Sequence, residues 1–433
     1  MSYEDEASAT PTGDAARVDS ARHPASMHIA FFLENLGGGG RQKVLLIIAG
    51  ELAARGHRVE VLVCKAEGPM LDQLPAGIEL TTLDRAPLPL ARLYALRADP
   101  AGLSALFRPV LVTHRPSETL AWLPGLVKYL RGAKPDALLT GTPYMNVEAW
   151  LACRMADSGC RLVLTEHNDL SQGHPLGSGF HARYLPALCH RAYLEADAIV
   201  TVSRGLATEL AERTRIPEDR ITVIYNPVVT PDLVQKSLEP LDHPWFAPEL
   251  PPVILGAGRL GRAKDFLTLV SAFARVRKLR PVRLVILGAG KGKKDKPDKR
   301  ETEIRELADR LGVSGDMDLQ GFVANPFPFM KQAAVFAVSS RYEGFCNVIV
   351  EAMACGTPVV STDCPSGPSE ILQNGQYGPL VPVGDDAALA DAIIRLLDSP
   401  TDPEILRSRA GFFTVSRAVD GYERILSGRN AAG

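Results

Sequence analysis

Residues 341–370 read RYEGFCNVIVEAMACGTPVVSTDCPSGPSE and hold two glutamates, Glu343 and Glu351, separated by seven residues. An apolar, strand-like run (residues 333–338) precedes them, and the helix-like run CNVIVEAMAC follows Phe345. The backbone amides at the start of a helix have no partner within the helix, so they suit phosphate oxygens. Carboxylates nearby accept hydrogen bonds from hydroxyls. The stretch is therefore a suitable place to hold a nucleotide-sugar.

Outward from this stretch, strand-like and helix-like runs alternate. From Met27, MHIAFFLENL predicts a strand, GGGG a turn, RQKVLLIIAGELAARGH a helix closed by Gly56, and RVEVLVC the next strand. Further strands are predicted at residues 137–140, 161–165 and 198–202. A second unit begins at PVILGAGRL and continues through VRLVILGAG, MDLQGFV, AAVFAVSS and TPVVSTD, with helices near residues 266–280, 300–311 and 345–354. This alternation predicts two doubly wound α/β domains.

Composition bounds the class of protein. The chain has 433 residues, a formal net charge of −2 and 46% hydrophobic residues, as expected of a soluble globular protein that is not a bulk nucleic-acid binder. Its seven cysteines are scattered without a CxxC pair, which favours reduced thiols, a cytoplasmic location and no structural zinc. No apolar run approaches the ~20 residues that a membrane-spanning helix needs.

Segment composition predicts the domain boundaries. Residues 1–26 are polar and partly acidic, which predicts a disordered leader rather than a signal peptide. Prolines are dense over residues 229–252, which predicts a linker. The linker separates a first domain at residues 27–228 from a second domain at residues 253–410, which is expected to hold the nucleotide-sugar.

Several motifs together resemble one enzyme family. Five elements are similar to those of the retaining GT-B glycosyltransferases of family GT4. They are the E-x7-E spacing, the segment GRLGRAKDF from Gly258 to Phe266, the loop GGGGRQKV, the strand-end EHN and the run DCPSGPSE. The resemblance covers about residues 27–426 and is strongest in the second half. It implies the GT-B fold, with two Rossmann-like domains that face each other across a cleft. It also implies that a C-terminal helix within residues 411–433 crosses back to the first domain.

The resemblance implies roles in donor binding for residues of the second half. Arg259 and Lys264 would neutralise the donor diphosphate, as a departing diphosphate requires. Glu351 would accept hydrogen bonds from the ribose hydroxyls, and Glu343 would lie beside the sugar ring. The remaining donor residues are expected to be Phe322, Val323, Gly344, Phe345, Cys346 and Asn347, the last four of them through backbone amides where they adjoin the helix start. A thiol at a helix N-terminus is also expected to have a lowered pKa, although we expect no catalytic role for Cys346.

The first half supplies fewer recognisable residues. His167, in the strand-end EHN, resembles the family histidine that approaches the transferred sugar, and with Glu343, Arg259 and Lys264 it completes the expected catalytic set. Gly38 and Gly39 resemble the glycine loop that approaches the donor, and Asn226 resembles another element that lines the cleft. The glutamate usual in that glycine loop is replaced here by Arg41 or Gln42.

The activity implied by the resemblance is transfer of a hexose or N-acetylhexosamine from a nucleotide-diphosphate sugar, with UDP favoured, to a hydroxyl of a glycan or lipid-linked acceptor. Retention of anomeric configuration is expected. No cofactor and no metal are expected, because cations already neutralise the diphosphate. Two alternatives stay open at this point. They are a nucleotide-sugar epimerase on the same fold and an NAD-dependent oxidoreductase, the latter suggested by the GxGxxG of Gly256 to Gly261.

Residues 85–134 are basic and rich in apolar side chains. Their carboxylates, Asp99 and Glu118, are outnumbered by the cations Arg85, Arg92, Arg97, Arg108, Arg115, Lys128, Arg131 and Lys134. Such a surface predicts peripheral contact with an anionic membrane or a lipid diphosphate. The same pattern also fits the solvated face of two amphipathic helices. A second basic run, KGKKDKPDKR at residues 291–300, is typical of a solvated loop.

Overall fold

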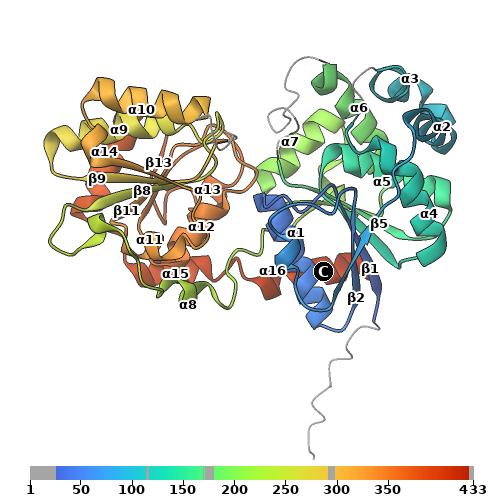
Figure 1. Ribbon diagram of the computed structural model, residues 1–433, viewed down its shortest axis with the longest axis horizontal. Coiled ribbons are helices and arrows are strands. Elements are labelled where there is room, and N and C mark those ends of the chain that lie inside the picture. The colour runs from blue at the N-terminus through green and yellow to red at the C-terminus, as the bar shows by residue number, and fades with distance from the viewer. Residues whose placement is uncertain (1–25, 114–116, 169, 171–179, 291–297, 429–433) are drawn as a thin grey trace, which may run out of the picture.

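The computed structural model describes residues 26–113, 117–168, 170, 180–290 and 298–428. Each half of the chain builds a parallel β-sheet that carries helices on its faces (Figure 1). Most of the predicted leader (residues 1–25) and most of the second basic run (residues 291–297) lie outside the described residues. The two sheets with their covering helices confirm the predicted α/β class.

The sheet of the first half has the strand order β3-β2-β1-β4-β5-β6-β7 with parallel neighbours throughout. Its inner strands are apolar and buried along most of their length, as expected of strands covered on both faces. The strands are β1 (His28–Leu33), β2 (Arg58–Val63), β3 (Ile78–Thr82), β4 (Ala137–Thr140), β5 (Arg161–Glu166), β6 (Ala198–Thr201) and β7 (Ile221–Val223).

Helices cover both faces of this sheet (Figure 1). They are α1 (Gly40–Ala54), α2 (Leu88–Ala98), α3 (Leu103–Leu106), α4 (Leu123–Ala133), α5 (Pro143–Ala156), α6 (Phe180–Glu195) and α7 (Arg204–Thr214). A buried core of β1, β2 and α1 side chains lies on one face, and a core that includes Trp150 and Tyr193 lies on the other. The strand order reverses between β1 and β4, which places a ligand crevice at the carboxyl ends of these two strands.

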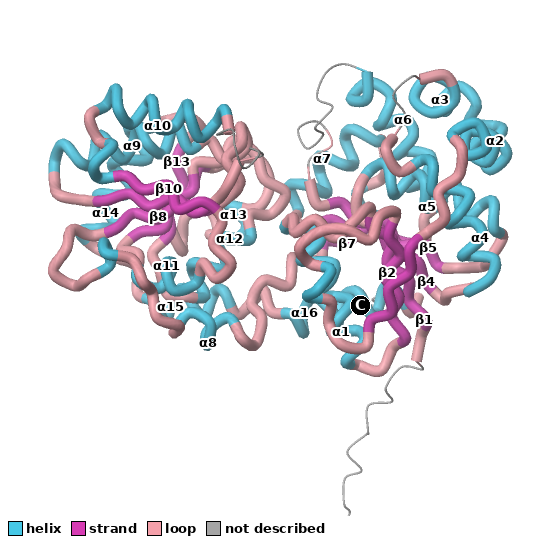
Figure 2. Tube along the Cα trace, in the orientation of Figure 1, coloured by secondary structure: helices cyan, strands magenta, loops and turns pink. Residues whose placement is uncertain are grey.

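The sheet of the second half repeats the pattern with the order β10-β9-β8-β11-β12-β13. Figure 2 shows the two sheets side by side, with loops of each half between them. The strands are β8 (Val253–Ala257), β9 (Arg283–Leu287), β10 (Met317–Gly321), β11 (Val335–Val338), β12 (Val359–Thr362) and β13 (Leu380–Val381). The helices are α9 (Phe266–Leu279), α10 (Lys299–Leu311), α11 (Phe327–Gln332), α12 (Asn347–Ala354), α13 (Pro368–Ile371), α14 (Asp386–Asp398) and α15 (Pro403–Ala410).

The segment between the sheets is not a free connector. It includes α8 (Leu233–Ser237), which packs against α11, and its Leu233 is fully buried in the same core as Met330. Val229 also forms an isolated bridge with Thr414. The predicted boundaries of the linker at residues 229–252 stay a prediction, but this part of the chain packs on the second half.

The final helix, α16 (Val415–Leu426), packs on the first half. Val419 and Tyr422 are buried in the core that α1 and β1 share. On its polar side, Arg55 donates hydrogen bonds to Asp420 (2.7 Å) and Glu423 (2.8 Å). The chain therefore crosses between the halves twice, once near residue 228 and once near residue 414. In the described part of the chain, no helix combines the length and apolar character needed to cross a bilayer.

Candidate active site

An ion pair joins two predicted site residues of the second half. Lys264 lies on the loop between β8 and α9, and Glu343 lies on the loop between β11 and α12. Because β8 and β11 are neighbours, these loops meet at the sheet edge, and Lys264 Nζ lies 2.6 Å from Glu343 Oε1. The hydroxyl of Ser340 donates to the same carboxylate oxygen at 2.6 Å. Burial alone would lower the pKa of Lys264, but the carboxylate of Glu343 outweighs it and raises that pKa.

Helix α12 begins at Asn347, two residues later than predicted, because Cys346 adopts the left-handed region at φ +78°. A residue in that conformation cannot belong to a right-handed helix. The prediction of a lowered thiol pKa for Cys346 is wrong. Its side chain is buried, and burial together with the carboxylate of Glu343 raises the pKa well above the usual value. Desolvation of the thiolate exceeds any stabilisation by a helix of this short length.

Glu351 lies in α12, and its side chain is 13% exposed. The nearest cation comes from the first half: Lys43 Nζ, on the first turn of α1, lies 3.8 Å from Glu351 Oε1. The same ammonium lies 5.9 Å from the centroid of the Phe327 ring. The start of α1 therefore faces α12 across the boundary between the halves.

The Glu343–Asn347 loop contacts the first half directly. A side chain at Gly344 would place its Cβ 1.9 Å from the backbone oxygen of His167, so only glycine fits. Ser203, the N-cap of α7, donates to the carbonyl of Gly344 at 2.7 Å. Asn226 Nδ2 donates to Asn347 Oδ1 at 2.8 Å. Two residues predicted from the first half, His167 and Asn226, thus meet the segment that begins with Glu343.

His167 follows β5 and has only 7% of its surface exposed. Burial, assisted by the nearby charge of Arg41, lowers the pKa of its imidazole to about 3, so the ring is neutral at pH 7. Its Nε2 lies 3.0 Å from Thr165 Oγ1, and that hydroxyl donates its proton to the carbonyl of Thr140 at 2.8 Å. Since a hydroxyl has one proton, Thr165 must accept from the Nε2–H of His167.

This assignment leaves Nδ1 of His167 as the nitrogen with a free lone pair. Nδ1 is buried and makes no hydrogen bond to any described residue. A buried polar atom without a partner is costly, and a role in binding a ligand is one explanation for it. His167 can therefore accept a hydrogen bond from a ligand hydroxyl, and it has no proton to donate at Nδ1.

The glycine loop includes one residue in the left-handed region. Gly38 has φ +76°, and a Cβ there would lie 3.1 Å from the ring of Pro69. Gly39 is the N-cap of α1, and its carbonyl accepts from the amide of Lys43 at 3.0 Å. The loop continues directly from β1, at the point where the strand order reverses.

The other predicted residues occupy different surroundings. Arg259 is exposed on the loop after β8. Phe322 follows β10 with 81% of its surface exposed, whereas Val323 is partly buried against the core of the second half. Phe345 is buried, with its ring centroid 5.5 Å from that of Tyr225 and 5.4 Å from that of Phe413. Phe345 thus anchors the loop rather than facing the cleft.

Glu370 forms a contact between the halves that the sequence did not reveal. Its carboxylate accepts from the amides of Arg204 and Gly205, at 2.9 Å each, and from the hydroxyl of Tyr225 at 2.9 Å. The first two donors are the N-terminal amides of α7, where a negative charge is favourable. The serine–glutamate pattern at the end of DCPSGPSE indicated a polar turn at Glu370. It could not indicate the partner of Glu370, because α7 is far away in the sequence.

A buried carboxyl network lies behind His167. Glu166 is 1% exposed, and its side chain contacts Tyr193 and Asn146, which donates at 2.7 Å. Burial raises the pKa of Glu166 to about 8, so the carboxyl is largely protonated at pH 7. Sequence reasoning passed over this residue, because a glutamate next to a strand-end histidine gives no sign of whether it is buried.

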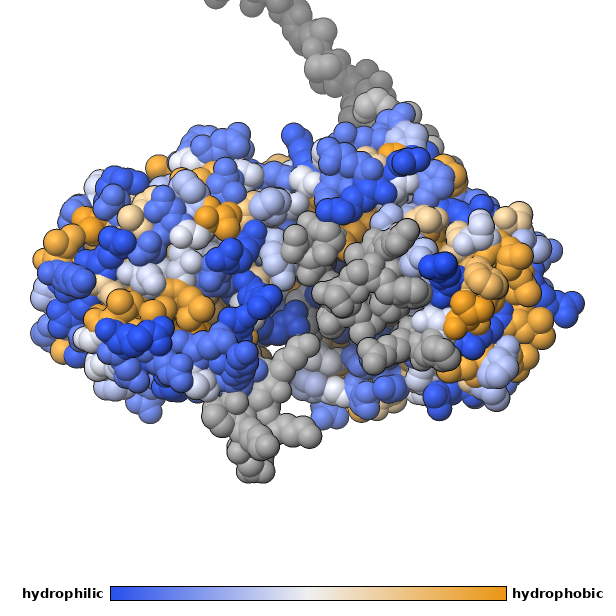
Figure 3. Space-filling model, turned by 90° about the horizontal axis from the view of Figure 1, so that it is seen from above, coloured by the Kyte–Doolittle hydropathy of each residue, from blue (hydrophilic) through white to orange (hydrophobic). Residues whose placement is uncertain are grey.

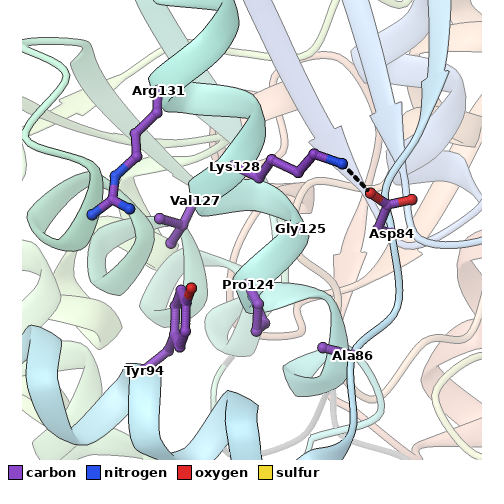
Figure 4. Close-up of a pocket in the computed structure, with 8 residues that line it drawn as sticks. All are labelled: Asp84, Ala86, Tyr94, Pro124, Gly125, Val127, Lys128 and Arg131. Atoms are coloured by element: carbon purple, nitrogen blue, oxygen red, sulfur yellow. Dashed lines mark hydrogen bonds and ion pairs between the residues drawn. The ribbon is translucent and has the colours of Figure 1, made fainter.

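A separate cavity of about 410 Å³ opens between α2 and α4 (Figure 4). Lys128 on its rim lies 2.8 Å from Asp84, and the lining residues are Asp84, Ala86, Tyr94, Pro124, Gly125, Val127, Lys128 and Arg131. None of the predicted donor residues lines it. Both helices lie on the side of the first half that faces away from the second (Figure 1). In the described residues, no group of three or more histidine, cysteine or acidic side chains is arranged to hold a metal ion.

The fold and the contacts between the halves therefore define a class of protein: two Rossmann-like units whose switch-point loops meet across their boundary. Comparison with known families agrees. Residues 38–231 match the family described as Glycosyltransferase Family 4, and residues 251–399 match the family described as Glycosyl transferases group 1. The chain is a glycosyltransferase with the GT-B fold, and it belongs to the GT4 type.

Individual relatives fit this assignment. The N-acetylgalactosamine-N,N'-diacetylbacillosaminyl-diphospho-undecaprenol 4-alpha-N-acetylgalactosaminyltransferase of Campylobacter jejuni is 29% identical over 69% of this chain and 80% of its own length. The lipopolysaccharide core biosynthesis glycosyltransferase LpsE of Rhizobium meliloti is 32% identical over 55% of this chain and 66% of its own length. The structure of Anabaena Alr3699/HepE in complex with UDP and glucose has a TM-score of 0.70 at 22% identity, covering 93% of this chain and 99% of that one.

Proposed function

We propose that this glycosyltransferase moves a hexose or N-acetylhexosamine from a nucleotide-diphosphate sugar, with UDP favoured, to a hydroxyl of a glycan or lipid-linked acceptor, with retention of configuration. The observation that carries the proposal is the packing of the Glu343–Asn347 loop against His167 and Asn226. This arrangement puts carboxylates, helix amides and a neutral imidazole around one cleft. Such groups complement hydroxyls and phosphates together.

Within the proposal, each group has a chemical task. Glu351 accepts from the ribose hydroxyls, and Glu343, held by Lys264, accepts from the sugar. His167 accepts from a sugar hydroxyl through Nδ1, because its other nitrogen already donates to Thr165. The exposed ring of Phe322 is available to pack on the nucleobase. Arg259 and Lys264 stabilise the negative charge that develops on the departing diphosphate.

We expect the leaving phosphate to help remove the acceptor proton, so that attack and departure occur on the same face of the sugar and the configuration is retained. The neutral His167 has too low a pKa to act as the base at pH 7. No metal is required in this scheme, since cationic side chains perform the neutralisation.

The preference for UDP and for a glycan or lipid-linked acceptor draws on the relatives. The Campylobacter jejuni relative is named for an N-acetylgalactosaminyl transfer to an undecaprenyl-diphosphate glycan, and the Rhizobium meliloti relative for lipopolysaccharide core synthesis. The Anabaena structure is a complex with UDP and glucose. We carry over to this chain the class of donor and acceptor, and leave the particular sugars to experiment.

The test is nucleotide release from a panel of UDP-, GDP- and ADP-sugars, with and without a crude lipid extract. We expect release from one donor class, accelerated by extract, and a loss of roughly 100-fold or more in Glu351→Gln. Glu404→Gln, an exposed glutamate on α15, is the matched control. The anomeric configuration of the product, read by NMR, tests retention.

The alternatives give different outcomes. An epimerase would convert the nucleotide-sugar without any acceptor and without net nucleotide release. An oxidoreductase would bind NAD rather than a nucleoside diphosphate. Neither release nor binding of any nucleotide would overturn the proposed donor site.

We further propose that the basic surface at residues 85–134 contacts an anionic membrane. Five apolar side chains of this segment are 40% to 49% exposed: Leu90, Leu93, Leu103, Phe107 and Val112. Exposed cations accompany them, among them Arg97 and Arg108. Figure 3 shows apolar patches together with hydrophilic residues at the first-half end of the face seen from above. Arg115 lies outside the described residues.

Vesicle sedimentation tests this contact. We expect binding to vesicles that contain phosphatidylglycerol, and weaker binding to pure phosphatidylcholine, because each cation near such a surface contributes about 1 kcal/mol. Arg97→Gln with Phe107→Ser should weaken binding, whereas Arg305→Gln with Leu279→Ser, an equal change on the exposed surface of the second half, should not. Equal binding by both double variants would contradict the assignment of this surface.

A further inference from the structure

Cations from both halves lie near the donor loops, and they differ in how they are compensated. Lys264 is paired with Glu343 at 2.6 Å, and Lys43 lies 3.8 Å from Glu351. Arg41 and Arg259 make no hydrogen bond and no ion pair with any residue that the structure describes. Each lysine therefore has a carboxylate within ion-pair distance, whereas the two guanidinium groups have no such partner among the described residues.

Arg41 is the less expected of these two groups. It is the second residue of α1, directly after the glycine loop, and its side chain is partly buried. Two residues further along the same helix, Lys43 lies 3.8 Å from Glu351 of the second half, so the start of α1 lies at the boundary between the halves. Arg259 approaches from the loop after β8, and the two positive charges are close enough to disfavour each other.

The anions near Arg41 do not balance it. Burial keeps Glu166 largely protonated at pH 7, since its pKa is raised to about 8. Glu34 directly follows β1, and burial and the neighbouring Glu118 raise the pKa of its carboxyl also. Neither lies within ion-pair distance of the guanidinium, and burial of Arg41 lowers its own pKa. An arginine that is desolvated and unpaired lowers the stability of the folded protein. Such an arginine is retained where a ligand supplies the missing negative charge.

We infer that Arg41 binds the diphosphate of the nucleotide-sugar from the first half, opposite Arg259 of the second half. This inference rests on the function proposed above. Each phosphate of a sugar nucleotide carries a negative charge, which matches the two unpaired guanidinium groups, and arginine presents parallel donors that fit phosphate oxygens.

A diphosphate in the cleft has two sources, the nucleotide donor and a lipid-diphosphate acceptor. The inference commits to the donor, because Arg41 lies in the first turn of α1, whose Lys43 contacts the donor residue Glu351, rather than on the basic surface at residues 85–134. A measurement with nucleotide alone separates the two sources, because no lipid is then present.

The experiment is calorimetric titration of UDP, GDP and ADP into the wild type, Arg41→Gln, Arg41→Lys and the surface control Arg305→Gln, with uridine as the ligand that lacks phosphates. For the nucleotide that the wild type binds, we expect Arg41→Gln to weaken binding by roughly 10- to 100-fold, and uridine binding to be unchanged. Arg41→Lys should recover part of the loss, because it restores the charge without the paired donors.

Thermal melting of the free enzyme separates ligand binding from a structural role. If Arg41 serves the ligand, Arg41→Gln should leave the melting temperature unchanged or raise it, because an unpaired buried charge is removed. A lower melting temperature together with unchanged nucleotide affinity would overturn the inference. A variant weakened only towards a lipid-diphosphate acceptor would overturn it also. If the wild type binds none of the three nucleotides, the proposed donor site itself fails, and that outcome is distinct.

Discussion

The two faces of the cleft compensate their charges differently. On the second-half face, Lys264 is held by Glu343 at 2.6 Å, and Ser340 donates to the same carboxylate at 2.6 Å. On the first-half face, Arg41 has no partner among the described residues, and Nδ1 of His167 is buried without one. The second-half face thus contains a satisfied ion pair beside the unpaired Arg259, whereas on the first-half face neither Arg41 nor Nδ1 of His167 has a partner among the described residues.

This difference indicates how the work is divided. A satisfied network positions its groups with little reorganisation, which is what stabilises a developing charge. Unpaired buried groups raise the free energy of the unliganded protein, and a ligand that pairs with them removes this penalty. They therefore couple ligand binding to the approach of the two halves. Substitutions on the second-half face should therefore damage turnover, and those on the first-half face should act mainly on affinity and stability.

The largest effect is expected for Lys264→Ala. Removing the ammonium leaves Glu343 as an uncompensated, mostly buried carboxylate and removes a cation from the departing diphosphate. We expect a loss of about 1000-fold in kcat/KM for nucleotide release, mostly in kcat. Lys278→Ala, an exposed lysine on α9, is the control. If Lys264→Ala retained more than a tenth of the activity, the claim that the second-half face determines turnover would be contradicted.

A smaller effect is expected for Glu370→Gln. The amide keeps one acceptor oxygen, so its NH2 group would face the backbone amide of either Arg204 or Gly205, which needs an acceptor. We expect the melting temperature to fall and kcat/KM to fall by about 10-fold, since a charged hydrogen bond at a helix N-terminus is worth about 1–2 kcal/mol. Steady-state rates and thermal melts measure both. A variant with normal activity would show that this contact does not align the halves.

A pH-dependent effect is expected for Glu148 in α5 of the first half. Burial raises the pKa of this carboxyl to about 7. Because the folded pKa lies above the unfolded value, its contribution to stability is complete below pH ~4.5 and is lost as pH rises through about 7. Glu148→Gln should flatten the fall in melting temperature between pH 5 and pH 8, a span worth at most roughly 3 kcal/mol. An equally steep fall in the variant would contradict the buried, protonated state.

The smallest effect is expected for Cys346→Gly. The thiol is buried with a raised pKa, and its backbone at φ +78° suits glycine. Activity should stay within about 2-fold of the wild type, the loss of buried side-chain contacts being partly offset by the relieved backbone. In the wild type, iodoacetamide at pH 7.5 should modify Cys346 slowly, as peptide mass spectrometry would show. Rapid alkylation would restore the low-pKa prediction that the structure contradicts.

Much of the fold could be predicted from local pattern. The predicted strand at residues 137–140 is β4 with the same bounds, and α9 differs from its predicted range by one residue at its end. The prediction for α12 failed at its start, because the left-handed conformation of Cys346 is set by packing of the loop on the first half and leaves no trace in residue type. Residue spacing also placed Glu343, Glu351 and Lys264 near one edge of the second sheet.

Other parts of the site depend on contacts between distant residues. The acceptor role of His167 Nδ1 follows from a hydrogen bond that Thr165 makes to Thr140 on the neighbouring strand. The partner of Glu370 is the N-terminus of a helix more than 150 residues away. Burial of Glu166 and Glu148, which determines their protonation at pH 7, is likewise a property of the packed first half.

The sequence by itself determined the α/β class, the two sheets and the family, because hydrophobic period and loop motifs are local and survive in any correctly folded chain. Only the tertiary structure decided which charges are balanced. Lys264 and Arg259 look alike in sequence, as cations of one loop, yet one faces a carboxylate and the other does not. The reason is that pairing and desolvation depend on distances across the boundary between the halves, which are fixed only when both sheets have folded and met.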